Sequence, residues 1–518
     1  GIRVMLKKRK NMDLKENITI GFLLLVAILI VGGVLGRNIG IEVIVNAATQ
    51  TERETNDSYA TANTITLGNS VTGNISNYDE DYYKIISTSN GKIELDFCHT
   101  YMDSYGIWMV STYKYENGEY IKLSSINIDL RDNEKVSLPF IGVVKNGIYY
   151  IKVERNYGDV NGEKYTIKTK FISSDYYEKE TNDSYQAATE LMKNKEYKGT
   201  INSSDDKDYY RIVASSNGMI KLDFCHTYVD SYGIWMVSTY KYEDGEYIKL
   251  SSTNIDLRDN EKVSLPFIGT VKNGIYYIKV ERSYGDVNGE EYTIKTKFTS
   301  SDYYEKESND AYALATKMKL EKTYKGTINS SSDEDFYKIV SPESGIIAVS
   351  FNHQYVDKYG SWEIHGYRYV NGQYIELGNT SISLNDKRTS SAVGFYAVKN
   401  GTYYIKIIKN WGEVVGENYS LKGAFFANSP TKFSVSVKKN KATLTWSRAK
   451  NITGYEVYYK KGKTGKYKKL ASTTKTKYTY KKLNKRNTYY FKVRAYKKVG
   501  GSKIYYSTYT NVKSARYK

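Results

Sequence analysis

Gly147-Ile-Tyr-Tyr-Ile-Lys152 is a strand-forming stretch that recurs as Gly-x-Tyr-Tyr-Ile-Lys at 274–279 and 401–406, with a step of 127 residues each time. Around it, apolar residues such as Ile93, Leu95 and Phe97 alternate with polar ones, which is the pattern of half-buried strands. Asn-Gly pairs between the runs are turn signals. A period this long indicates tandem domains, and strands of this kind favour β-sandwiches.

Short, weakly helical stretches follow the start of each repeat, at 58–63, 184–192 and 311–320. Each repeat has only this one weakly helical stretch, just after its first acidic cluster.

The first 47 residues differ from the rest of the chain. Five basic residues between positions 7 and 15 precede an uncharged, mostly apolar run at 20–36, and Val45-Asn-Ala-Ala48 offers a cleavage site after Ala47. This pattern predicts a cleaved secretory signal or a retained N-terminal membrane anchor, and both readings stay open. Either one places the remainder outside the cell, secreted or attached to its surface. The sequence does not begin with Met, so whether it is a fragment of a longer secreted enzyme also stays open.

Charge is unevenly distributed along the chain. The net charge is +19, yet residues 48–428 carry −10, while residues 429–518 carry +25 from 26 basic residues and one acid, Glu456. A basic domain favours anionic partners, so we expect an anionic cell-wall polymer here, with a merely soluble lysine-rich surface as the alternative. The domain has no recognised nucleic-acid motif, so we expect no nucleic acid. Membrane contact is expected only through an uncleaved N-terminal segment.

Each repeat contains two clusters of oxygen-bearing side chains, Glu-x-Glu-x-Asn-Asp and then Asp-x-Asp-aromatic-Tyr. Ca²⁺ takes six to eight oxygen ligands, which the two clusters can supply if the fold brings them together. The alternative is that Asn-Asp caps a turn and Asp-x-Asp lies in a solvated loop. The candidate ligands are Glu52, Glu54, Asn56, Asp57, Asp79 and Asp81 in the first repeat; Glu178, Glu180, Asn182, Asp183, Asp206 and Asp208 in the second; and Glu305, Glu307, Asn309, Asp310, Asp333 and Asp335 in the third.

Aromatic residues form a second, weaker candidate site. Rigid amphipathic rings on a sandwich surface suit sugar or peptide ligands. The motif tryptophans, Trp108, Trp235 and Trp362, are instead expected in the core. The candidate ligand-binding residues are Tyr101, Tyr105, Tyr157, Tyr228, Tyr232, Tyr284, Tyr355, Tyr359 and Trp411.

A search for catalytic motifs finds no His-Glu-x-x-His, Gly-x-Ser-x-Gly, Walker loop or Cys-x-x-Cys. Three of the four histidines, His99, His226 and His353, occupy one repeat position, where a packed histidine is favoured. The two cysteines, Cys98 and Cys225, do not make a disulfide framework. We therefore expect no enzyme and no catalytic residue.

The repeats at 48–174, 175–301 and 302–428 resemble the bacterial pre-peptidase C-terminal domain. The resemblance rests on Glu-x-Asn-Asp near the repeat start, Gly-x-Ile before Asp-x-Asp, the Gly-x-Tyr-Tyr-Ile strand and a closing Gly-x-x-Tyr strand. It implies a jelly-roll-like sandwich. The collagen-binding domains of clostridial collagenases are a related branch, and that branch implies that the two acidic clusters are calcium ligands.

Residues 429–518 resemble a fibronectin type III domain. Trp446 stands at the family's buried strand B tryptophan, Gly454-Tyr-Glu-Val-Tyr458 matches strand C, and Leu483 and Tyr489 match the leucine and the tyrosine-corner residue. The resemblance implies an immunoglobulin-like sandwich and says little about function.

We therefore expect an all-β chain in which an N-terminal apolar helix precedes three jelly-roll-like repeats and one immunoglobulin-like sandwich. The expected function is non-enzymatic attachment to an extracellular polymer, either protein matrix or polysaccharide, with calcium as stabiliser. Two alternatives stay open: an accessory substrate-binding or stabilising portion of a secreted peptidase or glycosidase, and a structural surface stalk.

Overall fold

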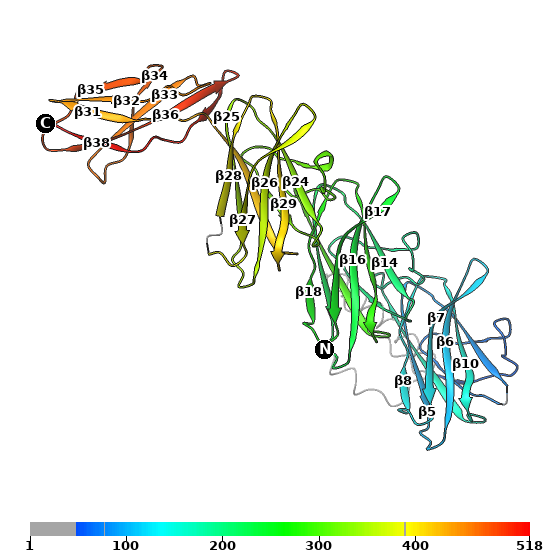
Figure 1. Cartoon of the computed structure of the whole chain (residues 1–518). Coiled ribbons are helices and arrows are strands. Elements are labelled where there is room, and N and C mark those ends of the chain that lie inside the picture. The colour runs from blue at the N-terminus through cyan, green and yellow to red at the C-terminus, as the bar shows by residue number, and fades with distance from the viewer. Residues whose placement is uncertain (1–47, 77, 388–389, 518) are drawn as a thin grey trace, which may run out of the picture.

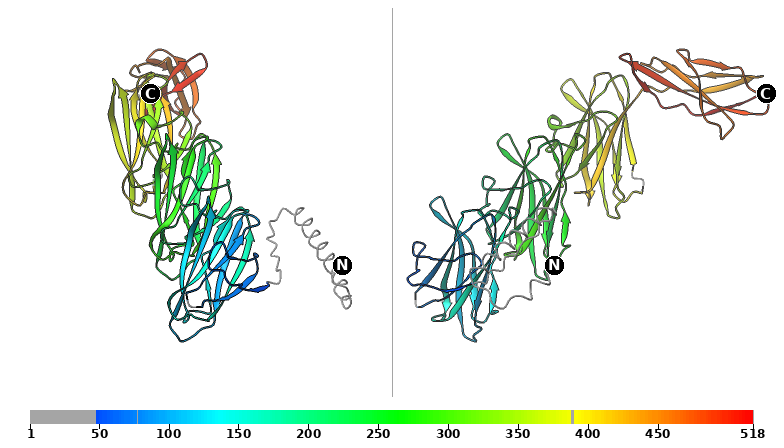
Figure 2. Two further views of the ribbon diagram at one scale, coloured as in Figure 1. Left: turned by 90° about the vertical axis from the view of Figure 1, so that its right-hand side faces the viewer. Right: turned by 180° about the vertical axis from the view of Figure 1, so that it is seen from behind.

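The computed structural model describes residues 48–76, 78–387 and 390–517. These residues are built almost entirely from strands arranged in separate sandwiches, which confirms the all-β prediction. The repeats follow one another in a staggered column, and the C-terminal domain is set at an angle to it (Figures 1 and 2). The predicted signal or anchor, with its apolar helix, lies outside the described residues. In the described part of the chain, no helix is long and apolar enough to cross a membrane.

Repeat 1 is a sandwich of two sheets, ordered β1-β3-β11-β5-β8, with β9 also on β5, and β2-β4-β10-β6-β7. The predicted Gly-x-Tyr-Tyr-Ile stretch opens the central strand β10. The strands are β1 (Thr49–Thr51), β2 (Asn63–Thr64), β3 (Ser70–Asn74), β4 (Glu80–Ile86), β5 (Gly91–His99), β6 (Gly106–Glu116), β7 (Glu119–Asp129), β8 (Lys135–Ser137), β9 (Ile141–Val143), β10 (Ile148–Gly158) and β11 (Lys164–Ser173).

Repeat 2 has the same two sheets, ordered β12-β14-β20-β16-β17 and β13-β21-β15-β18, with β19 on β15. Its strands are β12 (Thr189–Glu190), β13 (Glu196–Thr200), β14 (Lys207–Val213), β15 (Gly218–His226), β16 (Gly233–Glu243), β17 (Glu246–Asp256), β18 (Lys262–Ser264), β19 (Ile268–Thr270), β20 (Ile275–Gly285) and β21 (Glu291–Ser300).

Repeat 3 keeps this plan in sheets β22-β24-β29-β26-β27 and β23-β30-β25-β28. One strand, β28, takes the place of the two short strands found in the other repeats. Its elements are the 3₁₀ helix η2 (Tyr312–Leu314) and strands β22 (Thr316–Lys317), β23 (Thr323–Thr327), β24 (Glu334–Val340), β25 (Gly345–His353), β26 (Gly360–Val370), β27 (Gln373–Ser383), β28 (Ser390–Ala397), β29 (Thr402–Gly412) and β30 (Asn418–Phe426).

The C-terminal sandwich pairs the sheet β31-β32-β35 with the sheet β34-β33-β36-β37, to which β38 adds on β36. The predicted Trp446 and Tyr489 are both buried in its core. Its strands are β31 (Ser434–Lys438), β32 (Lys441–Thr445), β33 (Gly454–Lys461), β34 (Lys468–Thr473), β35 (Lys477–Tyr480), β36 (Thr488–Val499), β37 (Lys503–Tyr506) and β38 (Lys513–Arg516).

Each repeat has its own apolar core. Trp108, Trp235 and Trp362 are fully buried, as predicted. His99 packs beside Trp108, with 5.3 Å between the ring centroids, so the predicted packed histidine is confirmed. The cores explain the period-two pattern of the sequence, because alternate strand residues point into the sandwich.

The expected short helices are mostly wrong. In the described residues, only η2 of repeat 3 is helical, and the same positions in repeats 1 and 2 form turns. A hydrogen bond between the Ser58 and Thr61 hydroxyl groups stabilises the turn in repeat 1. The chain then pairs with the sheet through β2, β12 or β22, which leaves no room for a longer helix.

Successive repeats contact one another through an aromatic pair at each joint. Phe140 of repeat 1 meets Tyr177 of repeat 2 at 5.8 Å between ring centroids, and Phe267 meets Tyr304 at 5.6 Å at the next joint. All four rings are buried, so the contact excludes water from the joint.

Candidate metal centres

The two acidic clusters of each repeat meet where the chain enters the sandwich. In repeat 2, Glu178 and Glu180 lie on the extended segment before the first turn, and Asp208 lies at the start of β14. The backbone N–H of Tyr209 donates to the carbonyl of Asn182 at 2.9 Å, which fastens the first cluster beside the second. The same bond joins Tyr82 to Asn56 and Phe336 to Asn309 in the other two repeats.

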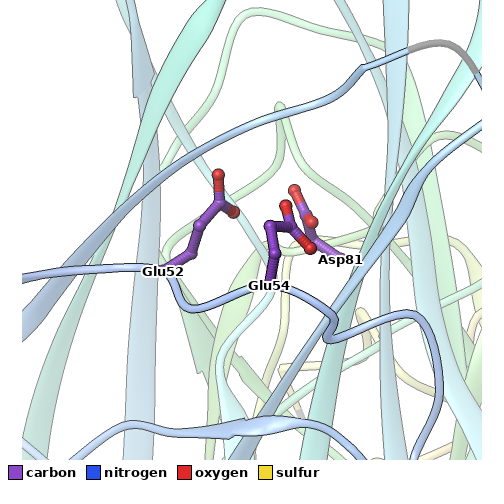
Figure 3. A group of neighbouring side chains, drawn as sticks. All are labelled: Glu52, Glu54 and Asp81. Carbon is purple, nitrogen blue, oxygen red and sulfur yellow. The ribbon is translucent and has the colours of Figure 1, made fainter.

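In every repeat, two glutamates and one aspartate converge so that one carboxylate oxygen from each lies within 4.8 Å of the others. The trio in repeat 1 is Glu52, Glu54 and Asp81, shown in Figure 3. The matching trios are Glu178, Glu180 and Asp208 in repeat 2, and Glu305, Glu307 and Asp335 in repeat 3.

A second trio adjoins the first in repeats 1 and 3 and shares one glutamate with it. Glu54 also converges with Asp57 and Asp79, and Glu307 with Asp310 and Asp333. In repeat 2, burial and then the charge of Glu180 raise the pKa of Asp206 well above its ordinary value, and the neighbouring Asp183 raises it further. The fold thus gathers the predicted acidic residues of both clusters in each repeat.

Burial makes these carboxylates hard to ionise together. It raises the pKa of Asp81 to about 8, although the Tyr165 hydroxyl that donates to this carboxylate opposes the shift. Burial, with the charge of Asp208 as the next cause, raises the pKa of Glu178 well above its ordinary value. Burial and the charge of Asp335 do the same to Glu305. Without a counter-charge, each centre therefore retains protons at pH values where carboxyls are normally ionised.

A tyrosine pair lies behind each centre and was not predicted from the sequence. Tyr292 donates to Asp208 Oδ2 at 2.6 Å, and its hydroxyl is 2.8 Å from that of Tyr210. Tyr419 donates to Asp335 in the same way, at 2.5 Å. The available signal was in the motifs themselves, because Tyr210 ends the Asp-x-Asp-aromatic-Tyr cluster and Tyr292 lies in the closing strand.

Asparagine side chains hold the glutamates in repeats 2 and 3. The amide of Asn202 donates to Glu180, and the amide of Asn329 donates to Glu307. In repeat 1 the corresponding position is Ser76, whose hydroxyl donates to Asp79. The centre of repeat 1 therefore lacks one of the contacts that orient a ligand in the other two.

The donor set suits a hard cation. Asp208 is fully buried, and its Oδ1 has no hydrogen-bond partner among the described residues. Asp81 and Asp335 have the same unpartnered oxygen. A Cβ on Gly199 would lie 2.5 Å from a carboxylate oxygen of Glu178, so the backbone has to approach closely here. Buried, partnerless oxygens clustered at this density fit Ca²⁺, which binds carboxylate and amide oxygens.

The predicted aromatic residues lie on the surface, and in repeats 1 and 2 two of them form a ring pair. Tyr105 meets Tyr157 with ring centroids 5.5 Å apart, and Tyr232 meets Tyr284 at 5.4 Å. A guanidinium covers one ring of the first pair, with Arg131 at 5.0 Å from Tyr105. All nine predicted residues are between 40% and 74% exposed, namely Tyr101, Tyr105, Tyr157, Tyr228, Tyr232, Tyr284, Tyr355, Tyr359 and Trp411.

A second aromatic cluster lies on the outer face of the β2-β4-β10-β6-β7 sheet and escaped the sequence analysis. Tyr59 stacks on Tyr120 at 3.6 Å, with edge contacts to Tyr82, Tyr113 and Tyr150. The stack recurs at 3.6 Å between Tyr185 and Tyr247 and between Tyr312 and Tyr374. Its signal was a tyrosine two residues after the Asn-Asp pair of every repeat.

A basic cleft of about 590 Å³ lies where repeat 3 meets the C-terminal domain. Tyr505 packs against Phe425 at 4.9 Å and joins the two domains. Lysines from both domains line the cleft, and none of them forms an ion pair with a described carboxylate. The lining residues are Lys317, Met318, Lys319, Leu320, Lys338, Val340, Pro342, Lys503 and Tyr505.

Comparison with known proteins finds a family match for one domain and a similar protein for a larger part of the chain. Residues 428–512 match the fibronectin type III domain family, as the sequence predicted. The chain is also 25% identical over 257 residues to collagenase ColT of Clostridium tetani (strain Massachusetts / E88), across 47% of this chain. That match is too long to lie within the C-terminal domain alone, so part of it involves the repeats. It spans about a quarter (24%) of the collagenase.

Solved structures resemble parts of the chain. An Fn3-like protein from Clostridium thermocellum is 26% identical, and the match covers 17% of this chain and 92% of that one with a TM-score of 0.15. A two-domain fibronectin type III segment of chicken tenascin is 18% identical over 35% of this chain and 97% of that one, with a TM-score of 0.19.

Proposed function

We propose that the chain is a calcium-stabilised, non-enzymatic extracellular binding protein whose three repeats are pre-peptidase C-terminal-like domains. One observation carries the proposal. In each repeat a trio of converging carboxylates includes a fully buried aspartate with one oxygen that has no hydrogen-bond partner among the described residues. A cluster of this kind is unfavourable without a cation, because the charges repel and are poorly solvated.

The residues that would hold calcium in repeat 2 are Glu178, Glu180 and Asp208, with Asp183 and Asp206 beside them. A bound cation supplies the positive charge that lets these carboxylates ionise inside the protein. Glu178 is also positioned by the backbone N–H of Thr200, which donates to both of its oxygens at 3.1 and 3.2 Å. The Asn202 amide fixes the orientation of Glu180.

Calorimetric titration of the chelator-treated chain with CaCl₂ tests the calcium proposal. We expect saturable binding and a higher melting temperature in calcium. Asp208→Asn removes a buried ligand and should abolish the contribution of repeat 2. Asp205→Asn is the matched control, because Asp205 is an exposed neighbour with no resolved role at the site. Absence of binding, or equal behaviour of the two variants, contradicts the proposal.

The exposed aromatic pairs are our candidate polymer-binding surface. Rigid ring pairs lie at one place in repeats 1 and 2, and Tyr359 and Trp411 are exposed at the equivalent positions of repeat 3, which allows three weak contacts with one extended ligand. The collagenase relative favours a protein matrix such as collagen as the ligand. We expect Tyr157→Ala, Tyr284→Ala and Trp411→Ala, combined, to reduce retention on collagen, cellulose, chitin or cell-wall sacculi. Tyr396→Ala is the control, because Tyr396 is 81% exposed and lies outside the pairs.

A second partner is favoured by the basic cleft. Lys317, Lys319, Lys338 and Lys503 converge without described acidic partners, so an anionic cell-wall polymer would supply the missing charge. Retention on such a polymer should fall steeply with salt, and Lys503→Gln with Lys319→Gln should weaken it. Retention that is insensitive to salt would contradict this assignment.

The alternative function is an accessory portion of a secreted peptidase or glycosidase. The collagenase relative supports it, since that protein is several times longer than the matched segment. The gene decides between the two: an open reading frame that continues past Lys518 into a catalytic domain favours the accessory role.

A further inference from the structure

In repeats 1 and 2, a short strand near the end of the sandwich that faces the next repeat, β9 or β19, contacts the metal-site segment of that next repeat. We name residues 139–142 and 266–269 the exit segments, and residues 177–180 and 304–307 the leading segments. The carbonyl of Gly142 accepts a hydrogen bond from the backbone N–H of Glu180 at 3.1 Å. The carbonyl of Gly269 accepts one from Glu307 at 3.2 Å. In each downstream site, one glutamate that would bind the metal is thus held by the preceding repeat.

The exit segment needs glycine at its point of contact. A Cβ added to Gly142 would lie 2.2 Å from the backbone oxygen of Glu178, and one added to Gly269 would lie 2.2 Å from that of Glu305. Both neighbours are backbone atoms, so no side-chain rotation can relieve the overlap. The close approach therefore depends on the absence of a side chain.

The two outer ends of the repeat array lack these features. Strand pairing puts Gly142 opposite Lys92 in repeat 1, and puts Tyr396 at the equivalent place in repeat 3, opposite Ile346. Tyr396 is 81% exposed, and no repeat follows it in this sequence. At the start of repeat 1, Thr51 replaces the tyrosine that packs on the upstream phenylalanine at both internal joints. Within residues 48–76, 78–387 and 390–517, matched contact residues therefore occur only at the two joints between repeats.

The candidate metal centres also differ between the first repeat and a repeat that follows another. Glu178 and Glu180 are 0% and 2% exposed, whereas Glu54, the counterpart of Glu180 in repeat 1, is exposed. In repeats 2 and 3, the exit segment of the preceding repeat lies against Glu178 or Glu305 of the leading segment.

We propose that the exit segment of one repeat completes the cation site of the next, by holding the leading segment so that its glutamates converge with the buried aspartate. This inference rests on the proposed calcium binding. Its consequence is reciprocal: an intact joint strengthens calcium binding downstream, and bound calcium stabilises the joint by the same free energy. Gly142 and Gly269 are positioning residues for sites in a neighbouring domain.

The test uses the full chain with one intact site at a time. We number each candidate calcium site after its repeat. The double variant Asp81→Asn, Asp335→Asn keeps only site 2 intact. In that background we expect Gly142→Ala to weaken CaCl₂ binding by about 10- to 100-fold, as loss of outer-shell support does. Asp208→Asn with Asp335→Asn leaves site 1. There Gly142→Ala should leave the calcium affinity unchanged, because Gly142 lies near the exit of repeat 1, at the opposite end from site 1. Calorimetry measures the affinities, and thermal melting checks the fold.

Gly394→Ala is the matched control, since its Cβ would be 3.8 Å from the nearest atom, the Ile347 carbonyl oxygen. If Gly142→Ala does not melt cooperatively, Tyr177→Thr, which copies Thr51, decides by the same titration. Unchanged affinity at site 2, or equal losses at sites 1 and 2, overturns the inference while calcium binding stands. Failure of every site to take up calcium in the parent chain overturns the proposed function and this inference together.

Discussion

Repeat 1 and repeat 2 carry the same acidic motif in different surroundings. In repeat 2, a strand of the preceding repeat and the amide of Asn202 close the site around Glu180. In repeat 1, Glu54 is exposed, and Ser76 stands where repeat 2 has the asparagine. The comparison teaches that one acidic motif can have different surroundings, because Glu54 is exposed whereas its counterpart Glu180 is buried.

Removal of calcium should have the largest effect on stability, and it should destabilise the three repeats to different extents. Saturation at 100 times the dissociation constant contributes about 2.7 kcal/mol per site, which corresponds to roughly 5–15 °C in the melting temperature of a domain. We expect Asp208→Asn and Asp335→Asn to remove more of this stabilisation than Asp81→Asn. Calorimetric melts of the full chain with and without chelator measure it. Equal losses in all three variants would erase the distinction between open and closed sites.

The metal-free chain should lose stability as pH rises. A raised pKa means that the folded carboxyl keeps a proton which the unfolded chain releases near pH 4, so the free energy of unfolding falls with rising pH. For Asp81 the fall ends near its folded pKa of about 8, and burial raises the pKa of Glu178 and Glu305 in the same direction, so they add to the fall. Melting temperatures after exhaustive chelation, between pH 4.5 and 8.5, measure the slope. Saturating calcium should make the melting temperature less dependent on pH. A melting temperature of the metal-free chain that rises with pH would contradict the prediction.

Exchanging one side chain should make site 2 resemble site 1. Asn202→Ser removes the amide that orients Glu180, and we expect about a tenfold loss of calcium affinity at site 2. Ser76→Asn is the reverse change and should strengthen site 1. Calorimetric titration measures both. Asn440→Ser is the control, because Asn440 lies in the C-terminal sandwich, where its amide donates to the Lys481 carbonyl. If neither exchange alters calcium affinity, burial by the upstream repeat accounts for the whole difference.

The sandwich fold could be predicted from sequence because its cause is local. Alternation of residues such as Ile93 and Leu95 directly reflects which side of a strand faces the core. The gathering of Glu178 with Asp208 could also be anticipated, since three copies of each cluster recur in register. The role of Gly142 could not, because its contact lies in the next domain. The tyrosine pair behind Asp208 was missed for a similar reason, as its members come from strands distant in sequence.

The ion pairs at the first joint offer the smallest expected effect on stability. Lys92 is buried at the first joint and forms ion pairs with Glu94 at 2.9 Å and Glu291 at 2.7 Å. Burial opposes its charge, but the hydrogen bonds to these two carboxylates raise its pKa overall. At the second joint the equivalent residue is Met219, which shows that the same geometry tolerates an apolar side chain.

Lys92→Met should therefore change the free energy of unfolding by no more than about 1 kcal/mol, because replacing a buried ion pair by an apolar contact is often neutral. Glu291 does not become an unpaired buried charge, since Lys198 also binds it at 2.7 Å. Denaturant unfolding of the full chain measures the change, and Lys170→Met, with its side chain 54% exposed, is the surface control. A loss of several kcal/mol would mean that the first joint depends on charge and the second does not. The two joints would then share their backbone contact at glycine but differ in what stabilises it.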